Sequence, residues 1–365
     1  MMSQLDISCG RERHAIYFDD YQNDLNNFSY VPHNIPGPGT DVEPFEEQYK
    51  GCQCAEICGQ QCPCITRFGP TYQGSKILIH GLLQSQTMKP IYECNKECKC
   101  NTNCSNRVVQ NGLQYKVSAF TTKWKGYGLK TLETIPKNAF VCEYAGEFLT
   151  HNEARRRTHA LKHKTDSNYI ITLKEHLGEN ILKTYIDPTN VGNVGRFMNH
   201  SCMPNLAMLP VRVDNSVPHL ALFAIRDIEE GEELCYNYSG ELYIVNEGDI
   251  DEDGETETVN MEQNTAKTNE DSASRDATNM VITSTNMDNP NSDGNDTIDD
   301  DKHLGASQKD DSKGVQSKEV CFDDQVKSID VNRTDTISVD RKVCHCGTSA
   351  CTGFLPYDAS LFDDD

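Results

Sequence analysis

The sequence has no long hydrophobic run. Among its 365 residues, no stretch approaches the roughly 20 apolar residues that a transmembrane helix needs. Residues 1–13 mix polar and charged types, so we expect neither a secretory signal peptide nor a membrane span. Without export, the 17 cysteines are expected to be reduced thiols that serve as metal ligands, and a disulfide framework is the less favoured alternative.

An excess of positive charge is also missing. The formal net charge is -22, and most of it falls between residues 247 and 340, which hold 25 acidic and 8 basic residues but a single aromatic residue, Phe322. Such a segment cannot bury enough apolar surface to offset the entropy of ordering. We therefore predict an acidic disordered insert over residues 241–340. A solvated linker is favoured over a docking site for a basic partner.

The rest of the chain divides into four parts by composition. An N-terminal arm, 1–44, is marked by prolines; a cysteine-dense domain covers 45–111, a strand-rich domain 112–240, and a cysteine motif with the C-terminal tail 341–365. Residues 140–147 and 220–224 have the length and composition of strands. Thr150 and Glu153 form a capping box ahead of a helix over 154–164. The fold class is therefore mainly β (α+β), built of short strands.

Nine cysteines lie close together in the cysteine-dense domain: Cys52, Cys54, Cys58, Cys62, Cys64, Cys94, Cys98, Cys100 and Cys104. Nine ligands do not divide into separate four-cysteine sites. Three tetrahedral zinc ions need twelve bonds, which nine thiolates supply if three of them each bridge two ions. A compact three-zinc cluster fits this count, and two conventional zinc sites with one spare thiol are the alternative.

A second set of thiols stands near the C-terminus. Cys344, Cys346 and Cys351 form a C-x-C-x4-C block without a local fourth ligand. Far upstream, Asn199-His200-Ser201-Cys202 places a cysteine next to a polar pair. Four thiolates complete a tetrahedral structural zinc site, so Cys202 is the candidate that ties this motif to a binding pocket.

These motifs together resemble a known family. Residues 90–95, Pro-Ile-Tyr-Glu-Cys-Asn, and the run from Cys98 to Gln110 are similar to the pre-SET domain of the suppressor-of-variegation class of histone lysine methyltransferases. Residues 112–240 resemble a SET domain, and residues 344–351 resemble a post-SET motif. The resemblance implies a SET-domain fold of short strands with a pseudoknot-like core, and zinc-stabilised pre-SET and post-SET modules. It also implies three zinc ions on the nine cysteines and a fourth on Cys202, Cys344, Cys346 and Cys351.

The resemblance further implies S-adenosyl-L-methionine as cofactor. Residues Lys125-Gly126-Tyr127-Gly128 match the family's glycine-aromatic-glycine loop, although alone they would indicate an ordinary hairpin turn. Glycine lets the backbone approach a ligand closely, and Lys125 offers a charge for a carboxylate. Tyr127 stands where the family usually has tryptophan. A second cofactor segment is matched by Arg196, Asn199 and His200.

Three tyrosines match the family's catalytic positions. Tyr169 and Tyr238 are expected to align the lysine amine and polarise the methyl group, with Tyr169 also at the cofactor. The lysine must be neutral and desolvated, and burial near a positive sulfonium lowers its pKa. Tyr236 matches a position that is phenylalanine or tyrosine in the family, where tyrosine predicts mono- and dimethylation. Asn237 replaces the family's usual aspartate.

We therefore expect a histone-lysine N-methyltransferase of the nucleus and chromosome that acts on the histone H3 tail in chromatin. A basic, disordered tail can lie as an extended strand in a groove of the SET domain. We expect no membrane association and no direct nucleic-acid site, because the cysteine-rich region has only scattered basic residues. A catalytically weak or inactive histone-tail-binding protein and a cysteine-rich nucleic-acid-binding module are the alternatives.

Overall fold

The computed structural model describes residues 5–19, 25, 27–67, 69–74, 76–77, 90–161, 168–177, 180–240, 278–284, 342–356 and 361, with the backbone alone at 177 and 278–284. All of these belong to one compact unit, residues 1–288 and 341–365. Apart from residues 278–284, the predicted acidic insert lies outside the described residues. Within the described part, no helix has the length and apolar character needed to cross a membrane.

The glycine-containing loop connects two strands of a small three-stranded sheet. Strands β7 (Val117–Thr121) and β8 (Tyr127–Thr131) pair antiparallel, and β1 (Tyr17–Phe18) joins β7 in parallel. Gly126 lies in the turn between β7 and β8 and has a φ of 69°, which glycine adopts without steric strain. Tyr127 follows this turn directly and is the first residue of β8.

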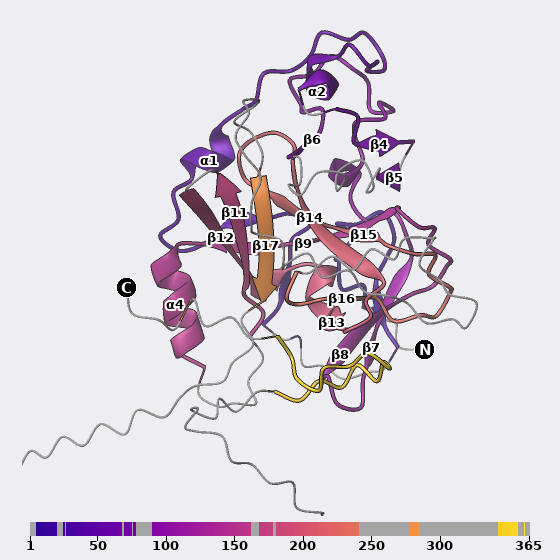
Figure 1. The fold of residues 1–365 in the computed structure, drawn as a ribbon, viewed down its shortest axis with the longest axis vertical. Helices are drawn as coiled ribbons and strands as arrows, with labels where there is room; N and C mark the ends of the chain where they lie inside the picture. Colours follow the sequence, from indigo (N-terminus) through magenta and orange to yellow (C-terminus); the bar gives the residue numbers. More distant parts are fainter. Residues whose placement is uncertain are drawn as a thin grey trace, which may run out of the picture. The chain divides into compact units, whose positions relative to one another are not determined.

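A second sheet has the order β17-β11-β12-β10-β3. Its members are β17 (Thr278–Ser284), β11 (Ile171–Leu177), β12 (Asn180–Gly192), β10 (Gly146–Leu149) and β3 (Ile35–Pro36), and β2 (Ser29–Tyr30) also pairs with β12. Figure 1 shows β17, in orange, alongside β11. One strand of this sheet thus comes from within the segment predicted to be disordered.

A third sheet carries the centre of the fold. Its order is β13-β16-β14-β15-β9, with bounds Asn199–His200, Cys235–Tyr236, Leu206–Arg212, His219–Ala224 and Phe140–Tyr144; β6 (Ile91–Tyr92) pairs with β14. Strands β4 (Tyr72–Gln73) and β5 (Lys76–Ile77) form a separate hairpin. The strands bury a continuous apolar interior: Leu220, Leu222 and Phe223 of β15 are fully buried. The mainly β prediction is confirmed.

The strand predicted over 140–147 is in fact two strands. Strand β9 ends at Tyr144 and β10 begins at Gly146, and they belong to different sheets. The Asn193 side chain accepts a hydrogen bond from the amide of Ala145 at 3.2 Å, which secures the chain where it passes from one sheet to the other. Continuous apolar composition does not reveal this change, because both strands are largely buried.

The helices are short. They are α1 (Glu43–Glu46), α2 (Pro63–Thr66), α4 (His151–His159) and the 3-10 turns η1 (Val109–Asn111) and η2 (Val194–Phe197). Thr150 caps α4 by accepting a hydrogen bond from the amide of Glu153 at 3.2 Å, so the predicted helix start is confirmed. The predicted end at residue 164 is wrong, because α4 ends at His159 and Ala160 is its C-cap.

The N-terminal arm is held against the third sheet by a buried carboxylate. Glu143 of β9 accepts hydrogen bonds from Nδ1 of His33 and of His219, at 2.7 and 2.9 Å. Burial opposes the charge on Glu143, but the charge of His219 and the two hydrogen bonds hold the pKa of Glu143 below 4.5. Burial likewise opposes charge on His219, and Glu143 outweighs it, raising the pKa of His219 above 6.5.

Candidate active site and metal centres

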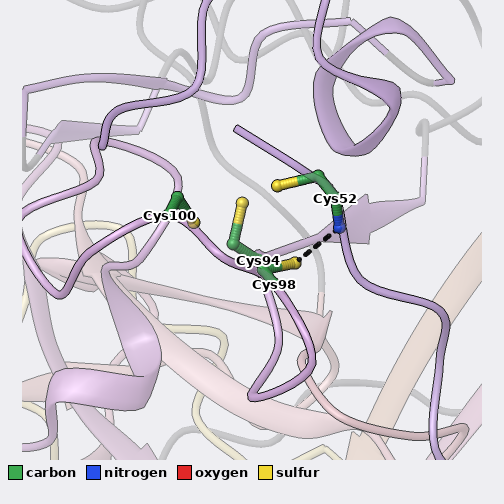
Figure 2. Close-up of side chains that lie close together, drawn as sticks. All are labelled: Cys52, Cys94, Cys98 and Cys100. Carbon is green, nitrogen blue, oxygen red and sulfur yellow. Dashed lines mark hydrogen bonds between the residues drawn. The ribbon is translucent and has the colours of Figure 1, made fainter. Parts of the chain in front are cut away.

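The nine cysteines of the cysteine-dense domain converge in space. Their sulfur atoms form three groups of four, each within 4.8 Å: Cys52, Cys94, Cys98 and Cys100; Cys52, Cys54, Cys58 and Cys62; and Cys58, Cys94, Cys100 and Cys104. Figure 2 shows the first group, in which the amide of Cys52 donates a hydrogen bond to the sulfur of Cys98 at 3.3 Å. The ninth thiol, Cys64, lies 3.7 Å from the sulfur of Cys98.

The sulfur spacing fits metal ligands. Cys58 Sγ lies 3.5 Å from both Cys52 Sγ and Cys94 Sγ. A tetrahedral zinc ion with Zn–S bonds of about 2.3 Å separates its sulfur ligands by about 3.8 Å, whereas a disulfide brings them to about 2.05 Å. Every cysteine in the described part of the chain is a free thiol. The expectation of reduced thiols is therefore confirmed for these residues.

Because the thiols are so close together, most of them can ionise only when a cation is bound among them. Burial and the neighbouring thiols raise the pKa of Cys58. Burial also opposes ionisation of Cys52, but the backbone amide of Cys54 and nearby thiols outweigh it and lower the pKa of Cys52 to about 6. Several thiolates can share this space only if positive charge is supplied, so a dication would bind with release of protons.

A fourth group joins the strand-rich domain to the C-terminal cysteine motif. Cys202 comes together with Cys344, Cys346 and Cys351, and their sulfur atoms lie within 4.8 Å of one another. Cys202 Sγ and Cys344 Sγ are 3.9 Å apart, although 142 positions separate them in sequence. His345 stacks on Trp124 of the β7–β8 turn, with ring centroids 5.9 Å apart. The C-terminal motif therefore adjoins the glycine-containing turn.

His200 connects this metal centre to Tyr238, which is partly buried. Its Nε2 lies 3.3 Å from Cys202 Sγ, and its Nδ1 accepts a hydrogen bond from the backbone amide of Tyr238 at 3.1 Å. Burial and the charge of Lys125 lower the pKa of His200 to about 4. The imidazole is therefore neutral at physiological pH, with its proton on Nε2 facing the sulfur, and it orients Tyr238 without carrying charge.

Asn199 and Lys125 both donate hydrogen bonds to the carboxylate of Glu233. Asn199 donates hydrogen bonds to the carbonyl of Tyr127 and to Oε1 of Glu233, both at 2.8 Å. Lys125 Nζ lies 2.8 and 2.7 Å from the two oxygens of Glu233. Glu233 thus pairs the positive charge of Lys125 that was expected to face a ligand carboxylate. Asn199 ties β13 to β8 through the Tyr127 carbonyl.

Arg196 projects into an aromatic enclosure. Its guanidinium carbon lies 4.7 Å from the ring centroids of both Phe28 and Tyr169, and 5.2 Å from that of Phe197. Its Nε atom is buried and has no hydrogen-bond partner within the described part of the chain. A buried donor left unpaired is unfavourable, so this enclosure suits a ligand that supplies an acceptor.

Three tyrosine side chains pack beside the same segment. The rings of Tyr236 and Tyr238 are 4.9 Å apart, and those of Tyr144 and Tyr236 are 6.2 Å apart. The hydroxyl of Tyr238 donates to the carbonyl of Met198 at 3.0 Å, and the hydroxyl of Tyr144 donates to the carbonyl of Tyr169 at 2.6 Å. Burial raises the pKa of all three phenols, so they remain neutral donors.

Three residues of the site were not predicted from the sequence. The sequence pattern places Tyr144 only in a strand, yet its side chain lies in the tyrosine cluster. Nothing in the sequence singles out Glu233, which accepts a hydrogen bond from Asn199. Phe28 of the N-terminal arm, which packs on Arg196, was also missed.

Asn237 occupies a turn rather than the tyrosine cluster. Its side chain is buried, and its Oδ1 accepts a hydrogen bond from the amide of Ser239 at 3.0 Å. Its carbonyl also accepts from the amide of Gly240 at 3.0 Å. An aspartate would accept the same bond from Ser239, so the amide preserves the local turn.

Known proteins match these features. Family models match residues 126–239 as a SET domain and residues 8–107 as a Pre-SET motif. The histone-lysine N-methyltransferase SETMAR of Mus musculus is 36% identical over 364 residues, covering 98% of this chain and 91% of the relative. The crystal structure of the methyltransferase domain of human SETMAR has a TM-score of 0.66 and 34% identity, covering 98% of this chain and 99% of that one.

A solved structure of KRYPTONITE in complex with mCHH DNA, H3(1–15) peptide and SAH is also similar. Its TM-score is 0.51 at 25% identity, and the match covers 69% of this chain and 50% of that chain. The Pre-SET match begins at residue 8, within the segment interpreted from the sequence as an arm.

Proposed function

This chain belongs to the family of SET-domain histone-lysine N-methyltransferases, and we propose that it transfers a methyl group from S-adenosyl-L-methionine to a lysine of the histone H3 tail. The observation that carries the proposal is the connection from Cys202 through His200 to Tyr238. It brings a candidate metal centre, a candidate cofactor segment and a partly buried tyrosine into direct contact. A histone tail is basic and extended, so it can bind by strand addition.

The residues around Arg196 fit the cofactor. Arg196 Nε supplies an unpaired donor, and Lys125, Gly126, Tyr127, Asn199 and His200 lie on the adjoining strands and turns. When bound, the cofactor supplies a methyl group on a positively charged sulfur. Arg196 would meet its polar part, while the Gly126 turn allows close backbone approach. Tyr169, which stacks on Arg196, would lie between the cofactor and the lysine.

The tyrosine cluster provides the environment for the lysine. Tyr236 is buried, Tyr238 is partly buried, and burial raises the pKa of both phenols. The same setting favours an uncharged amine over an ammonium ion. The hydroxyl of Tyr238 and the carbonyl of Met198 present oxygen atoms at this point, which can hold the amine in line with the methyl group. Tyr144 joins Tyr169 to this cluster and acts as a positioning residue.

We further propose that the products are mono- and dimethyl-lysine. The phenol of Tyr236 lies between those of Tyr144 and Tyr238 and takes up space that a bulkier methylated amine would need. Its hydroxyl could also retain a water molecule there. Tyr236 is thus the residue proposed to limit the number of methyl groups.

Four zinc ions fit the thiol arrangement. Cys52, Cys58, Cys94 and Cys100 each belong to two of the pre-SET groups. The first three would bridge two ions each, and the other six cysteines of that cluster would bind one ion each. Because Cys64 Sγ lies 3.7 Å from Cys98 Sγ, we assign Cys64 as the fourth ligand of the ion held by Cys52, Cys94 and Cys98. Cys100 would then bind only the ion that it shares with Cys58, Cys94 and Cys104. The fourth ion is assigned to Cys202, Cys344, Cys346 and Cys351. These ions act as structural ties between loops that have little core of their own.

The proposed substrate places the protein in chromatin, and therefore in the nucleus and on the chromosome. We propose no direct nucleic-acid site. A second function, recognition of the histone tail without methyl transfer, is favoured by one observation: Tyr127 and Asn237 depart from the family's usual residues. The turn at Asn237 is nevertheless intact, which supports the enzyme over the inactive reader.

A peptide array tests the proposal. The full chain is incubated with labelled S-adenosyl-L-methionine and an array of histone peptides, in parallel with a Tyr238→Phe variant. We expect label on H3 peptides with the natural chain and a loss of about 10–100-fold with the variant, because one positioned oxygen is removed. Binding of H3 peptides without any label would support the inactive reader instead.

A further inference from the structure

Strand β11 has both of its edges filled. Strand β12 pairs antiparallel with one edge, and β17 pairs antiparallel with the other, in continuous register from Ile171 opposite Ser284 to Leu177 opposite Thr278. Figure 1 shows β17 beside β11, and β17 is the edge strand of this sheet. Since a strand has only two edges for backbone hydrogen bonds, a further extended chain cannot pair with β11 while β17 is in place.

The filled edge leads to the tyrosine cluster. Strand β11 begins two positions after Tyr169, whose carbonyl accepts the hydrogen bond from the Tyr144 hydroxyl at 2.6 Å. Tyr169 also stacks on Arg196. An extended peptide that adds to this edge of β11 would therefore pass the proposed lysine site at the Ile171 end, which is where Ser284 of β17 now lies.

We infer that this edge of β11 receives the extended histone tail, and that β17 is an internal competitor that must leave before the tail can pair. This inference rests on the proposed function. Strand addition draws its affinity from main-chain hydrogen bonds, so a segment of unrelated sequence can occupy the same edge. The enzyme is then self-limited: its own insert covers the surface that takes the substrate.

The chemistry of the insert suits a displaceable strand. Residues 278–284, Thr-Asn-Met-Val-Ile-Thr-Ser, carry no charge and include four β-branched residues, which favour an extended strand. They contain no lysine, so this strand offers the site no amine. The sequence on both sides is acidic, and a histone tail is basic, so the insert can attract the tail before the exchange takes place.

Covalent linkage makes β17 an effective competitor. A tethered segment acts at a high local concentration without needing high intrinsic affinity. The apparent affinity for substrate falls in proportion to the fraction of molecules in which the edge is open. Displacement of β17 should therefore change KM for the peptide and leave kcat largely unchanged.

A double variant, Val281→Pro with Ile282→Pro, tests this. Alternate amides of a strand face each neighbour, so two adjacent prolines remove at least one donor directed at β11. The matched control, Ser272→Pro with Ala273→Pro, places the same two prolines outside β17 in the same insert. With a synthetic H3 tail peptide and the full chain, we expect KM to fall by about 3–10-fold in the first variant and to stay unchanged in the control.

An unchanged or higher KM in the β17 variant would overturn the inference while leaving the proposed methyl transfer standing. Absence of methylation in every variant, the natural chain included, would refute the proposed function and this inference together.

Hydrogen exchange gives a second test that needs no variant of β17. In the Tyr238→Phe protein, bound H3 peptide should increase amide exchange at residues 278–284 while β11 stays protected. If both strands keep their protection with the peptide bound, the tail binds elsewhere and the inference is wrong.

Discussion

Replacement of Cys202 by serine isolates the connection between metal and reaction. Cys202 Sγ is one of four sulfur atoms in its group and lies 3.3 Å from His200 Nε2. Serine keeps the size of the side chain but offers a hydroxyl, a poor zinc ligand at neutral pH. Three thiolates remain, so we expect the zinc content to fall from about four ions per chain to about three, with the nine-cysteine cluster intact.

The effect on turnover follows from two consecutive contacts. His200 lies against Cys202 on one side and accepts from the amide of Tyr238 on the other, at 3.1 Å. Without the metal, Cys202 no longer has a fixed position, so the His200 imidazole loses its fixed neighbour. The backbone at Tyr238, which donates to that imidazole, is then held less firmly. Loss of such supporting interactions at metal sites typically lowers activity about 10–100-fold, and we expect a fall of that size in kcat/KM.

The assay combines zinc analysis by mass spectrometry with steady-state kinetics on an H3 peptide. Cys9→Ser is the matched control, because Cys9 is an exposed thiol outside every sulfur group. That control should keep all zinc and full activity. A Cys202→Ser protein that binds three zinc ions and turns over at the natural rate would refute the connection, and loss of several ions would refute the independence of the two centres.

Two further predictions concern buried carboxylates. The buried carboxylate of Glu93 accepts hydrogen bonds from the Tyr72 hydroxyl, the amides of Val108 and Val109, and the Gln110 side chain. Glu93→Gln places an NH2 group against these donors, so we expect a loss of roughly 3 kcal/mol in the free energy of unfolding. The control Glu97→Gln, at an exposed position, should have no effect. Denaturant unfolding with equal losses for both variants would contradict this. The stability that comes from the raised pKa of His219 is complete below about pH 6.5 and is lost as pH rises through the higher pKa of the folded state. The stability that comes from the lowered pKa of Glu143 is complete above about pH 4.5 and is lost as pH falls through the lower pKa of the folded state. The difference in Tm between the natural chain and His219→Gln should therefore be largest near pH 5 to 6; a difference that grows toward pH 9 would show that charge on His219 is not its cause.

Features that depend on local patterns or on metal-ligand chemistry were predictable from the sequence. The cap at Thr150 was predictable because it depends on two residues three positions apart. The thiol groups were predictable because ligand chemistry requires four donors for each ion, even when Cys202 and Cys344 are far apart in sequence. Strand β15 was predictable from an uninterrupted apolar run.

Features that depend on long-range pairing were not predictable in the same way. The position of Tyr144 in the tyrosine cluster depends on β9 pairing with β15, and the role of Glu233 depends on β8 and β13 approaching one another. Strand β17 was missed because the composition of the whole insert concealed a short β-branched run. Such a run forms a strand only where an open edge, here that of β11, is available.

The most direct measurement is the mass spectrum of an H3 tail peptide after incubation with the full chain and S-adenosyl-L-methionine. We predict mono- and dimethyl-lysine as the main products of the natural chain, and trimethyl-lysine in addition from a Tyr236→Phe variant, whose pocket lacks the buried hydroxyl. Trimethyl-lysine as the main product of the natural chain would contradict the role of Tyr236. A peptide that binds but stays unmodified would contradict the proposed methyl transfer itself.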